Sequence, residues 1–301
     1  MQMTTTALLG LHAETSIHAG AGAALDVVDL PIQREAHTGW PCIFGSAVKG
    51  ALRAAATARK LPKIEVIFGP ENGNSSDYGG ALLVGDARLL LLPVRSLTGH
   101  FKWVTCPAVL RRLQRDAERV GLSGFTFQMP DVGPAQNGVP RAKALAADSA
   151  LYLEEYKFAV DADPALSSVI TAIAGLSGVS GFAQDLQRQF VLVSDEDFAI
   201  ISRYATPVTP HVALDSKPKR VRTGALWYEE TLPPETLLYV SLIANDARKP
   251  GNGGMTAAEV LKAATDELFK KPYLQVGGNE TVGMGWCKIA VHIQQNGTMG
   301  G

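Results

Sequence analysis

The 301-residue chain has few cysteines, no strong charge of either sign and no long apolar run, and each absence excludes a class of protein. Cys42, Cys106 and Cys287 are odd in number and far apart, so neither a disulfide framework nor a zinc-binding spacing is predicted. No segment reaches about 18 uninterrupted apolar residues, and the N-terminus lacks a basic start followed by an apolar stretch. We therefore expect a cytoplasmic protein that neither spans a membrane nor is secreted.

Charge and hydrophobicity limit the partners and the size of the core. Lys and Arg number 28 against 29 acidic residues, a formal net charge of -1, so no overall positive field predicts nucleic-acid binding. Any RNA or DNA contact must then depend on local clusters of charge. With 46% hydrophobic residues, the chain can bury a substantial core as one elaborated domain or two modest ones. We find no internal repeat of about 20 to 50 residues.

Hydrophobic periodicity predicts a mixture of strands and helices. Alternating β-formers indicate strands within 4–20, 81–94, 149–161, 190–193, 206–244 and 273–293, with 81–94 broken at Gly85–Asp86 and 206–244 forming a long hairpin. Helical spacing indicates helices within 45–60, 106–121, 164–178, 182–190, 194–205 and 255–271, with Ser46 and Thr256 as N-terminal caps. The Pro- and Gly-rich stretch 126–147 is interpreted as a long loop or insertion. Because strands and helices do not alternate regularly, the predicted fold class is α+β.

The polar loop 19–41 is the first candidate for a functional site. Asp26, Asp29 and His37 lie within it, and His18 directly precedes it. A lone histidine is more often a hydrogen-bonded structural residue, and no third ligand with metal-binding spacing is present. Asp29, which precedes Leu30–Pro31, is equally compatible with the cap of a turn. The residues alone leave both interpretations open.

Two further stretches admit an RNA or phosphate contact beside a plainer explanation. "VGGNETVGMG" at 276–285 contains glycines that let backbone N–H groups approach an anion, but it lacks the Lys and Ser/Thr of a P-loop and leads into a strand. A tight turn between strands is therefore favoured. "KPKRVR" at 217–222 clusters basic residues at the predicted hairpin tip, which is also what a solvated surface loop looks like.

Taken together, five stretches resemble one known family. They are "IHAGAGAALDVVDLPIQREAHTGWPCIFGSAVKGALR", "GDARLLLLPVRSLTGHFKWVTCPAVLRR", "LVSDEDF", "TGALWYEETLPPETLLY" and "LQVGGNETVGMGW". In this order they resemble the RAMP superfamily and, within it, the backbone subunits of the Cmr complex, a type III-B CRISPR effector. The resemblance runs from about residue 7 to about residue 291.

The resemblance implies a fold, an activity and partners. The fold would be α+β, a ferredoxin-like (RRM-like) palm with helical insertions and a protruding thumb β-hairpin. Residues 1–301 would form a single elaborated domain, with an insertion at about 126–150 and the thumb at about 207–233. Copies of the chain would stack as a helical filament along a CRISPR guide RNA, together with other Cmr subunits. The filament would capture single-stranded target RNA and cut it at regular intervals, with a loosely bound divalent metal such as Mg²⁺ or Mn²⁺.

The same resemblance assigns roles to individual residues. Asp29 matches the family's cleavage-essential aspartate and is the candidate metal contact, His18 matches a nearby family histidine, and either Glu229 or Glu230 matches a second acid. The predicted RNA contacts are Ser46, Lys49 and Arg53 on the helix at 45–60, the thumb residues Lys217, Lys219, Arg220 and Arg222, and Gly277, Gly278, Gly283 and Gly285 of the glycine-rich loop.

Elementary chemistry is compatible with this assignment. RNA carries its own nucleophile, the 2′-hydroxyl, so one well-placed carboxylate, with or without a metal, can support cleavage. Phosphate contacts from lysines and arginines would position RNA, and pairing with the guide would supply specificity. Two alternatives remain at this stage: a non-cleaving RNA-binding scaffold of the same fold, and an unrelated small-molecule enzyme that uses the glycine-rich loop for a phosphate.

Overall fold

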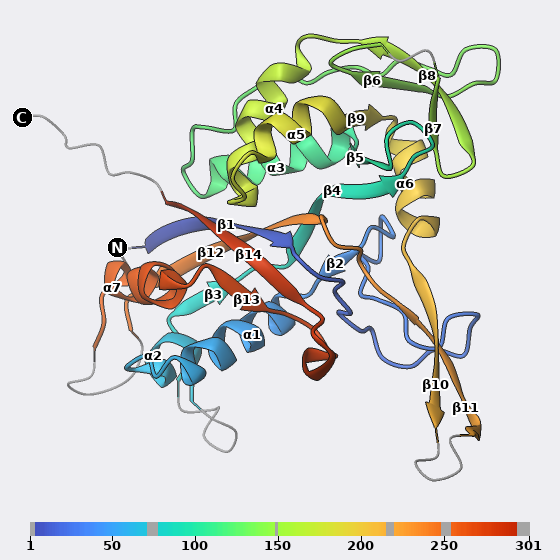
Figure 1. Cartoon of the computed structure of the whole chain (residues 1–301). Coiled ribbons are helices and arrows are strands. Elements are labelled where there is room, and N and C mark those ends of the chain that lie inside the picture. Colours follow the sequence, from blue (N-terminus) through green and yellow to red (C-terminus); the bar gives the residue numbers. More distant parts are fainter. Residues whose placement is uncertain (1–3, 71–77, 148–149, 215–219, 248–253, 294–301) are drawn as a thin grey trace, which may run out of the picture.

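A computed structural model describes residues 4–70, 78–147, 150–214, 220–247 and 254–293. Its largest element is a mixed sheet with the strand order β13-β14-β1-β12-β4-β5-β9-β6-β8-β7 (Figure 1). Two short strands lie off this path, where β2 pairs with β4 and β3 pairs with β12. The α+β class predicted from the sequence is confirmed.

The first strand, β1 (Thr4–Ala13), is central and covered on both faces. It pairs antiparallel with β12 (Leu237–Asn245) and with β14 (Trp286–Ile293). On one face the Thr5 hydroxyl donates to the carbonyl of Ala257 in α7 (Ala257–Lys262), and on the other the Thr6 hydroxyl donates to the carbonyl of Val120. Because both faces are covered, seven consecutive residues of β1 are buried, which explains its nearly continuous apolar sequence.

The other elements of the main body are these, in chain order. They are β2 (Cys42–Ile43), α1 (Gly45–Ala58), α2 (Ile64–Phe68), β3 (Leu82–Val84), β4 (Ala87–Arg95), β5 (Phe101–Thr105), α3 (Pro107–Arg119), β6 (Arg141–Ala144), β7 (Leu151–Leu153), β8 (Tyr156–Ala162), α4 (Leu166–Ala174), η1 (Gly175–Ser177), α5 (Phe182–Gln189), β9 (Phe190–Val193), α6 (Asp195–Tyr204), η2 (Ala263–Glu267), η3 (Leu268–Lys270), β13 (Tyr273–Gln275) and η4 (Glu280–Val282). In Figure 1 α1, α2 and α7 lie on one side of β1, while α3, α4 and α5 lie on the other.

Several elements differ in detail from the sequence prediction. Residues 141–144, which were interpreted as part of a long loop, form β6 and pair with β8 and β9. The strands on either side of Gly85–Asp86 are β3 and β4, and both use β12 as a partner instead of forming a hairpin with each other. Residues 149–161 contain two strands, β7 and β8, because the chain reverses at Glu154, whose φ is 51°. The helix at 255–271 changes type twice, from α7 through the π-helix η2 to the 3₁₀-helix η3.

The two predicted helix caps have opposite outcomes. Thr256 caps α7 through a capping box, in which its hydroxyl accepts from the backbone N–H of Glu259 and the Glu259 carboxylate accepts from the N–H of Thr256. Ser46 as the cap of α1 is wrong, because the helix begins at Gly45 and Phe44 occupies the N-cap position. The Asp86 carboxylate satisfies the start of this helix instead, accepting from the N–H of Gly45 at 2.6 Å.

A separate two-stranded hairpin projects from the body (Figure 1). Its strands are β10 (Val208–Leu214) and β11 (Val221–Glu230), paired antiparallel from Val208↔Glu230 to Leu214↔Val221. A hairpin is therefore present over 208–230, but the prediction that it continues to residue 244 is wrong, because residues 237–245 form β12 of the main sheet. Within the described residues, no helix is long and apolar enough to cross a membrane.

Candidate active site

Isolated β-bridges hold the polar loop that follows β1 against the end of β11 and the residues just after it. Ile17 forms an antiparallel bridge with Leu232, and Leu30 forms a parallel bridge with Glu229. The loop also pairs with itself, because Gly20 bridges Ile32. The backbone near Ile17 and near Leu30 is therefore fixed relative to β11, whereas polar loops are usually more mobile than this.

Asp29 has one carboxylate oxygen fixed and the other free for a ligand. Its Oδ2 accepts a hydrogen bond from the backbone N–H of Tyr228 at 2.7 Å, and the side chain is only partly buried. Among the described residues, no hydrogen bond reaches Oδ1. Asp26 differs, because it is exposed and, in the part of the chain that the structure describes, its Oδ1 accepts only from the N–H of the next residue, Val27. Of the two aspartates, Asp29 is the one that the fold orients.

His18 is oriented by the same strand. Its Nδ1 lies 2.8 Å from the carbonyl oxygen of Glu230. Since a carbonyl only accepts, Nδ1 must carry the proton, and the lone pair of the neutral ring is on Nε2. The tautomer follows from this hydrogen bond, and Nε2 is left to exchange protons.

The two anchoring groups are two residues apart on one edge of β11. Tyr228 supplies the N–H that holds Asp29, and Glu230 supplies the carbonyl that holds His18. At about 3.4 Å per residue, these anchors are roughly 7 Å apart along the strand. The structure thus brings together a carboxylate and an imidazole that are far from β11 in the sequence, which is a suitable pairing for general acid–base chemistry.

Glu229 and Glu230 are both buried, but their surroundings distinguish them. The Glu230 carboxylate accepts from Arg34 at 2.5 Å, from the Thr206 hydroxyl at 2.6 Å and from the N–H of Ile32 at 3.1 Å. The Glu229 carboxylate accepts from the side-chain amide of Asn279 at 2.5 Å and lies 4.0 Å from Nδ1 of His18. Glu230 is thus occupied by structural partners, while Glu229 is directed toward the site.

The predicted RNA-contacting residues of α1 are Ser46, Lys49 and Arg53. Ser46 is exposed, whereas Lys49 is partly buried, and this burial, followed by the nearby charge of Arg53, lowers the pKa of the Lys49 ammonium. One nitrogen of Arg53 donates to the carbonyl of Gly69 at 2.9 Å, so this side chain also helps to hold the segment after α2. An anion near Lys49 would relieve the repulsion between the two cations.

The glycine-rich loop 276–285 packs against the segment that carries His18, which follows β1. Gly278 donates its N–H to the carbonyl of His18, and Gly285 donates to the carbonyl of Ser16. A Cβ at Gly277 would lie 2.4 Å from the carbonyl oxygen of His18, and Gly277 has a φ of 88°. Gly283 has nothing within 4 Å of such a Cβ. Close backbone packing explains part of this motif, and its contact with RNA stays a prediction.

The basic hairpin tip is only partly described. Lys217 and Lys219 lie outside the described residues, Arg220 is exposed, and Arg222 lies within β11. At the base of the hairpin, an open groove of about 920 Å³ runs beside the polar loop. Its mostly apolar walls include Val27 and Val28 of the loop and Ile200 of α6. A polymer lying in this groove would pass close to the loop that carries Asp29.

Metal binding depends on which oxygen and nitrogen groups of the site are left for an ion. Within the described ranges, no group of three or more His, Cys, Asp or Glu side chains could hold a metal ion. The free oxygen of Asp29 fits a single contact to a hard cation, which would need water or RNA phosphate for its remaining ligands. A divalent ion shared with RNA is thus compatible with this donor set, and the described residues form no cluster for a resident metal centre.

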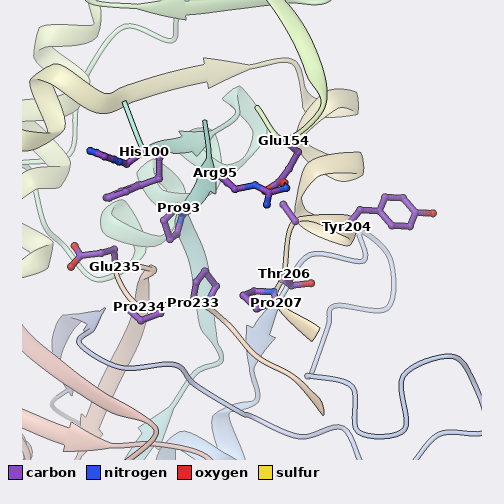
Figure 2. Close-up of a pocket in the computed structure, with 12 residues that line it drawn as sticks. Pro93, Arg95, His100, Glu154, Tyr204, Thr206, Pro207, Pro233, Pro234 and Glu235 are labelled. Atoms are coloured by element: carbon purple, nitrogen blue, oxygen red, sulfur yellow. The ribbon is translucent and has the colours of Figure 1, made fainter. Parts of the chain in front are cut away.

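A second cavity borders the groove, because Tyr204 and Thr206 line both (Figure 2). It has a volume of about 470 Å³ and opens between β4, β5, the end of α6 and the connection from β11 to β12. Figure 2 shows Arg95 close to Glu154, with Pro93 and Pro233 below them and Tyr204 pointing outward. No residue of the glycine-rich loop lines it, so this cavity does not support a small-molecule site built on that loop.

Comparisons with known proteins agree on one family. The RAMP superfamily model matches residues 11–288. The chain is 36% identical over 296 residues to the "CRISPR system Cmr endoribonuclease Cmr4" of Pyrococcus furiosus, covering 96% of this chain and 97% of the relative. It is 25% identical over 304 residues to the "CRISPR system CMR subunit Cmr4" of Saccharolobus solfataricus, covering 93% and 94%.

Solved structures agree with the sequence comparison. Oligomeric Cmr4 from Pyrococcus furiosus superposes with a TM-score of 0.73 at 32% identity, covering 97% of this chain and 99% of that one. A chain of the type III-B Cmr-beta complex bound to cognate target RNA superposes with a TM-score of 0.71 at 20% identity, covering 95% and 96%. At 20% identity, the similarity to the chain of the Cmr-beta complex shows a shared fold only.

Proposed function

The chain belongs to the RAMP superfamily, and we propose that it is the guide-RNA-binding backbone subunit of a type III-B CRISPR effector, in which it cleaves complementary target RNA. The observation that carries this proposal is the anchoring of Asp29 and His18 to the same edge of β11. The near full-length similarity to an endoribonuclease subunit supports it. The protein would act in the cytoplasm, in antiviral defence.

In this proposal the body of the chain is the ferredoxin-like palm and the hairpin β10–β11 is the thumb. Copies of the chain would stack along the guide RNA with other Cmr subunits. Lys49 and its neighbours on α1, the hairpin tip and the glycine-rich loop would contact RNA backbone. Such contacts position RNA without reading its sequence, so the formal net charge of -1 is no obstacle if the cations line one groove.

Cleavage would use the 2′-hydroxyl of the target as nucleophile. The 2′-oxygen forms a bond to phosphorus, the bond from phosphorus to the 5′-oxygen breaks, and the proton of the 2′-hydroxyl is accepted by a base. Asp29 fits this role because one oxygen is held by Tyr228 and the other is free. A divalent metal ion, when bound, would neutralise phosphate charge. The chain's own contribution is to hold Asp29 at a fixed place beside the groove.

The test is cleavage by complex reconstituted with guide RNA, labelled complementary RNA and Mg²⁺ or Mn²⁺. We expect Asp29→Ala and Asp29→Asn to retain guide binding, assembly and target capture and to lose cleavage at every site by at least about 100-fold. Asp26→Ala is the matched control and should be much milder, because Asp26 contacts only its own loop. Wild-type cutting by Asp29→Ala would refute the assignment.

Two other outcomes would favour the alternatives. Loss of target binding together with cleavage in Asp29→Ala would make Asp29 structural and the subunit a non-cleaving scaffold. Purification of the chain without any nucleic acid, together with failure to bind guide RNA, would favour a small-molecule enzyme.

A further inference from the structure

The reactive nitrogen of His18 has an open approach only because residue 20 is a glycine. A Cβ at Gly20 would lie 2.8 Å from Nε2, which is closer than real Cβ contacts. Nε2 makes no hydrogen bond within the described residues, and it is not among the enclosed atoms that lack a partner, unlike Nδ1 of His12. The ring is thus held at Nδ1 and accessible at Nε2.

The opposite side of the ring is held by a chain of polar contacts from the glycine-rich loop. Asn279 donates to the carboxylate of Glu229 at 2.5 Å, and that carboxylate lies 4.0 Å from Nδ1 of His18. Glu229 is only 5% exposed, so without Asn279 it would be a buried carboxylate with little to fix it. Asn279 therefore fixes the place of the carboxylate beside the Nδ1 edge of the ring.

We infer that His18 donates a proton from Nε2 to the 5′-oxygen leaving group, and that Gly20 and Asn279 are positioning residues for this step. The inference rests on the proposed function. As the bond from the 2′-oxygen to phosphorus forms and the bond to the 5′-oxygen breaks, Asp29 accepts the 2′-hydroxyl proton. His18, which enters this step with protons on both ring nitrogens, gives its Nε2 proton to the 5′-oxygen and becomes the neutral Nδ1–H tautomer that the carbonyl of Glu230 holds. The products are a 2′,3′-cyclic phosphate and a 5′-hydroxyl, and water returns the protons between turnovers.

The test compares two target RNAs in the reconstituted complex under single-turnover conditions. In one, the 5′-oxygen at a single cleavage site is replaced by sulfur, because a thiolate leaves without needing a proton. We expect Gly20→Ala to cut the ordinary RNA about 100-fold more slowly than wild type, and the sulfur-containing RNA within about threefold of wild type. Asn279→Gly should cut the ordinary RNA about tenfold more slowly than wild type and the sulfur-containing RNA at nearly the wild-type rate. Asp29→Ala should cut neither RNA. Rates are measured in both Mg²⁺ and Mn²⁺, since sulfur binds the two ions differently.

Matched variants control for the substitutions themselves. Gly124→Ala adds the same methyl at a glycine with open space around it and no positive φ. Asn137→Gly removes another asparagine with a left-handed backbone, at a φ of 52° against 60° for Asn279. Both control variants should cut both RNAs at the wild-type rate.

A chemical probe tests the same geometry without relying on activity. Diethyl pyrocarbonate acylates accessible, unprotonated imidazole nitrogen, and mass spectrometry locates the modified residue. In the free chain, Gly20→Ala should slow modification of His18 at least tenfold and leave His37, whose side chain is 78% exposed, unchanged. Unchanged modification of His18 would overturn the assignment of Gly20.

The outcomes separate the inference from the function on which it rests. If wild type cuts and Asp29→Ala does not, but Gly20→Ala and Asn279→Gly cut ordinary RNA at the wild-type rate, only the inference fails. If both variants lose the same activity on the two RNAs, His18 is not the proton donor and the inference also fails. If wild-type complex binds target and never cuts it, the proposed function fails as well.

Discussion

Replacement of Glu230 should destabilise the fold, whereas replacement of Glu229 should mainly affect cleavage. Glu230 accepts three hydrogen bonds, from Arg34, Thr206 and Ile32, and is 6% exposed. Removing one partner of a buried ion pair costs about 3 to 5 kcal/mol, and we take about 3 because the Arg34 side chain is 21% exposed and water can reach it.

This free energy converts into a measurable shift in melting temperature. At about 2.1 cal/mol/K per residue, the 301-residue chain has an unfolding entropy of roughly 0.6 kcal/mol/K, so Glu230→Ala should lower Tm by about 5 °C. Glu229→Ala removes one hydrogen bond, from Asn279, and at about 1 kcal/mol should lower Tm by about 2 °C. The exposed Glu155→Ala is the control and should leave Tm unchanged.

The measurement is thermal unfolding of the purified chain followed by circular dichroism, with cleavage measured on the same preparations. A double-mutant cycle with Arg34→Ala should show that the two losses are not additive, because each removes the same contact. A Glu230→Ala chain with wild-type Tm and no cleavage would refute the reasoning, and Glu230 would then be the acid of the site.

Three further predictions follow from single features of the structure. Lys49→Glu should weaken guide RNA binding about tenfold and impair filament assembly while Tm stays within about 2 °C, since a polar-face lysine contributes little to the core; normal assembly in sedimentation experiments would make Lys49 a solvated residue. Reversing Arg220 and Arg222 to glutamate should weaken RNA binding and flatten its salt dependence, and an unchanged slope across a salt series would remove the hairpin tip from the RNA contact. Burial, and then the nearby Glu35 carboxylate, raise the pKa of Cys42 to about 11, so iodoacetamide at pH 8 should not alkylate it before unfolding; rapid alkylation of the native chain would contradict this.

Sequence periodicity predicted most of the elements because each has a local cause. The helix α7 begins at Thr256 because its cap and Glu259 are three residues apart, which is visible in the sequence. The start of α1 was placed wrongly because its partner, Asp86, is 41 residues away. A cap supplied by a distant side chain leaves no local pattern.

In the candidate site, too, local features could be predicted from the sequence and contacts between distant segments could not. Asp29 and His18 were candidates because they match a family pattern in one loop, but their hydrogen bonds to Tyr228 and Glu230 join segments about 200 residues apart. The choice between Glu229 and Glu230 could not be made from their position, since adjacent residues differ only in the face of the strand they occupy. Asn279 was missed because its role depends on a contact with Glu229, and the only signal in the sequence was its place in a glycine-rich loop.

The strand β11 has two tasks at its two ends. One end continues into the hairpin tip, and the other supplies the backbone groups that hold Asp29 and His18. A strand resists stretching but tilts as a unit. If a mismatched guide–target duplex displaced the hairpin, β11 would therefore move the backbone groups of Tyr228 and Glu230, and with them Asp29 and His18, away from the scissile bond. Cleavage would then report how well the hairpin has docked, and a mismatch beneath it would slow cutting while leaving the RNA bound. The position of the hairpin would in this way couple target pairing to cleavage.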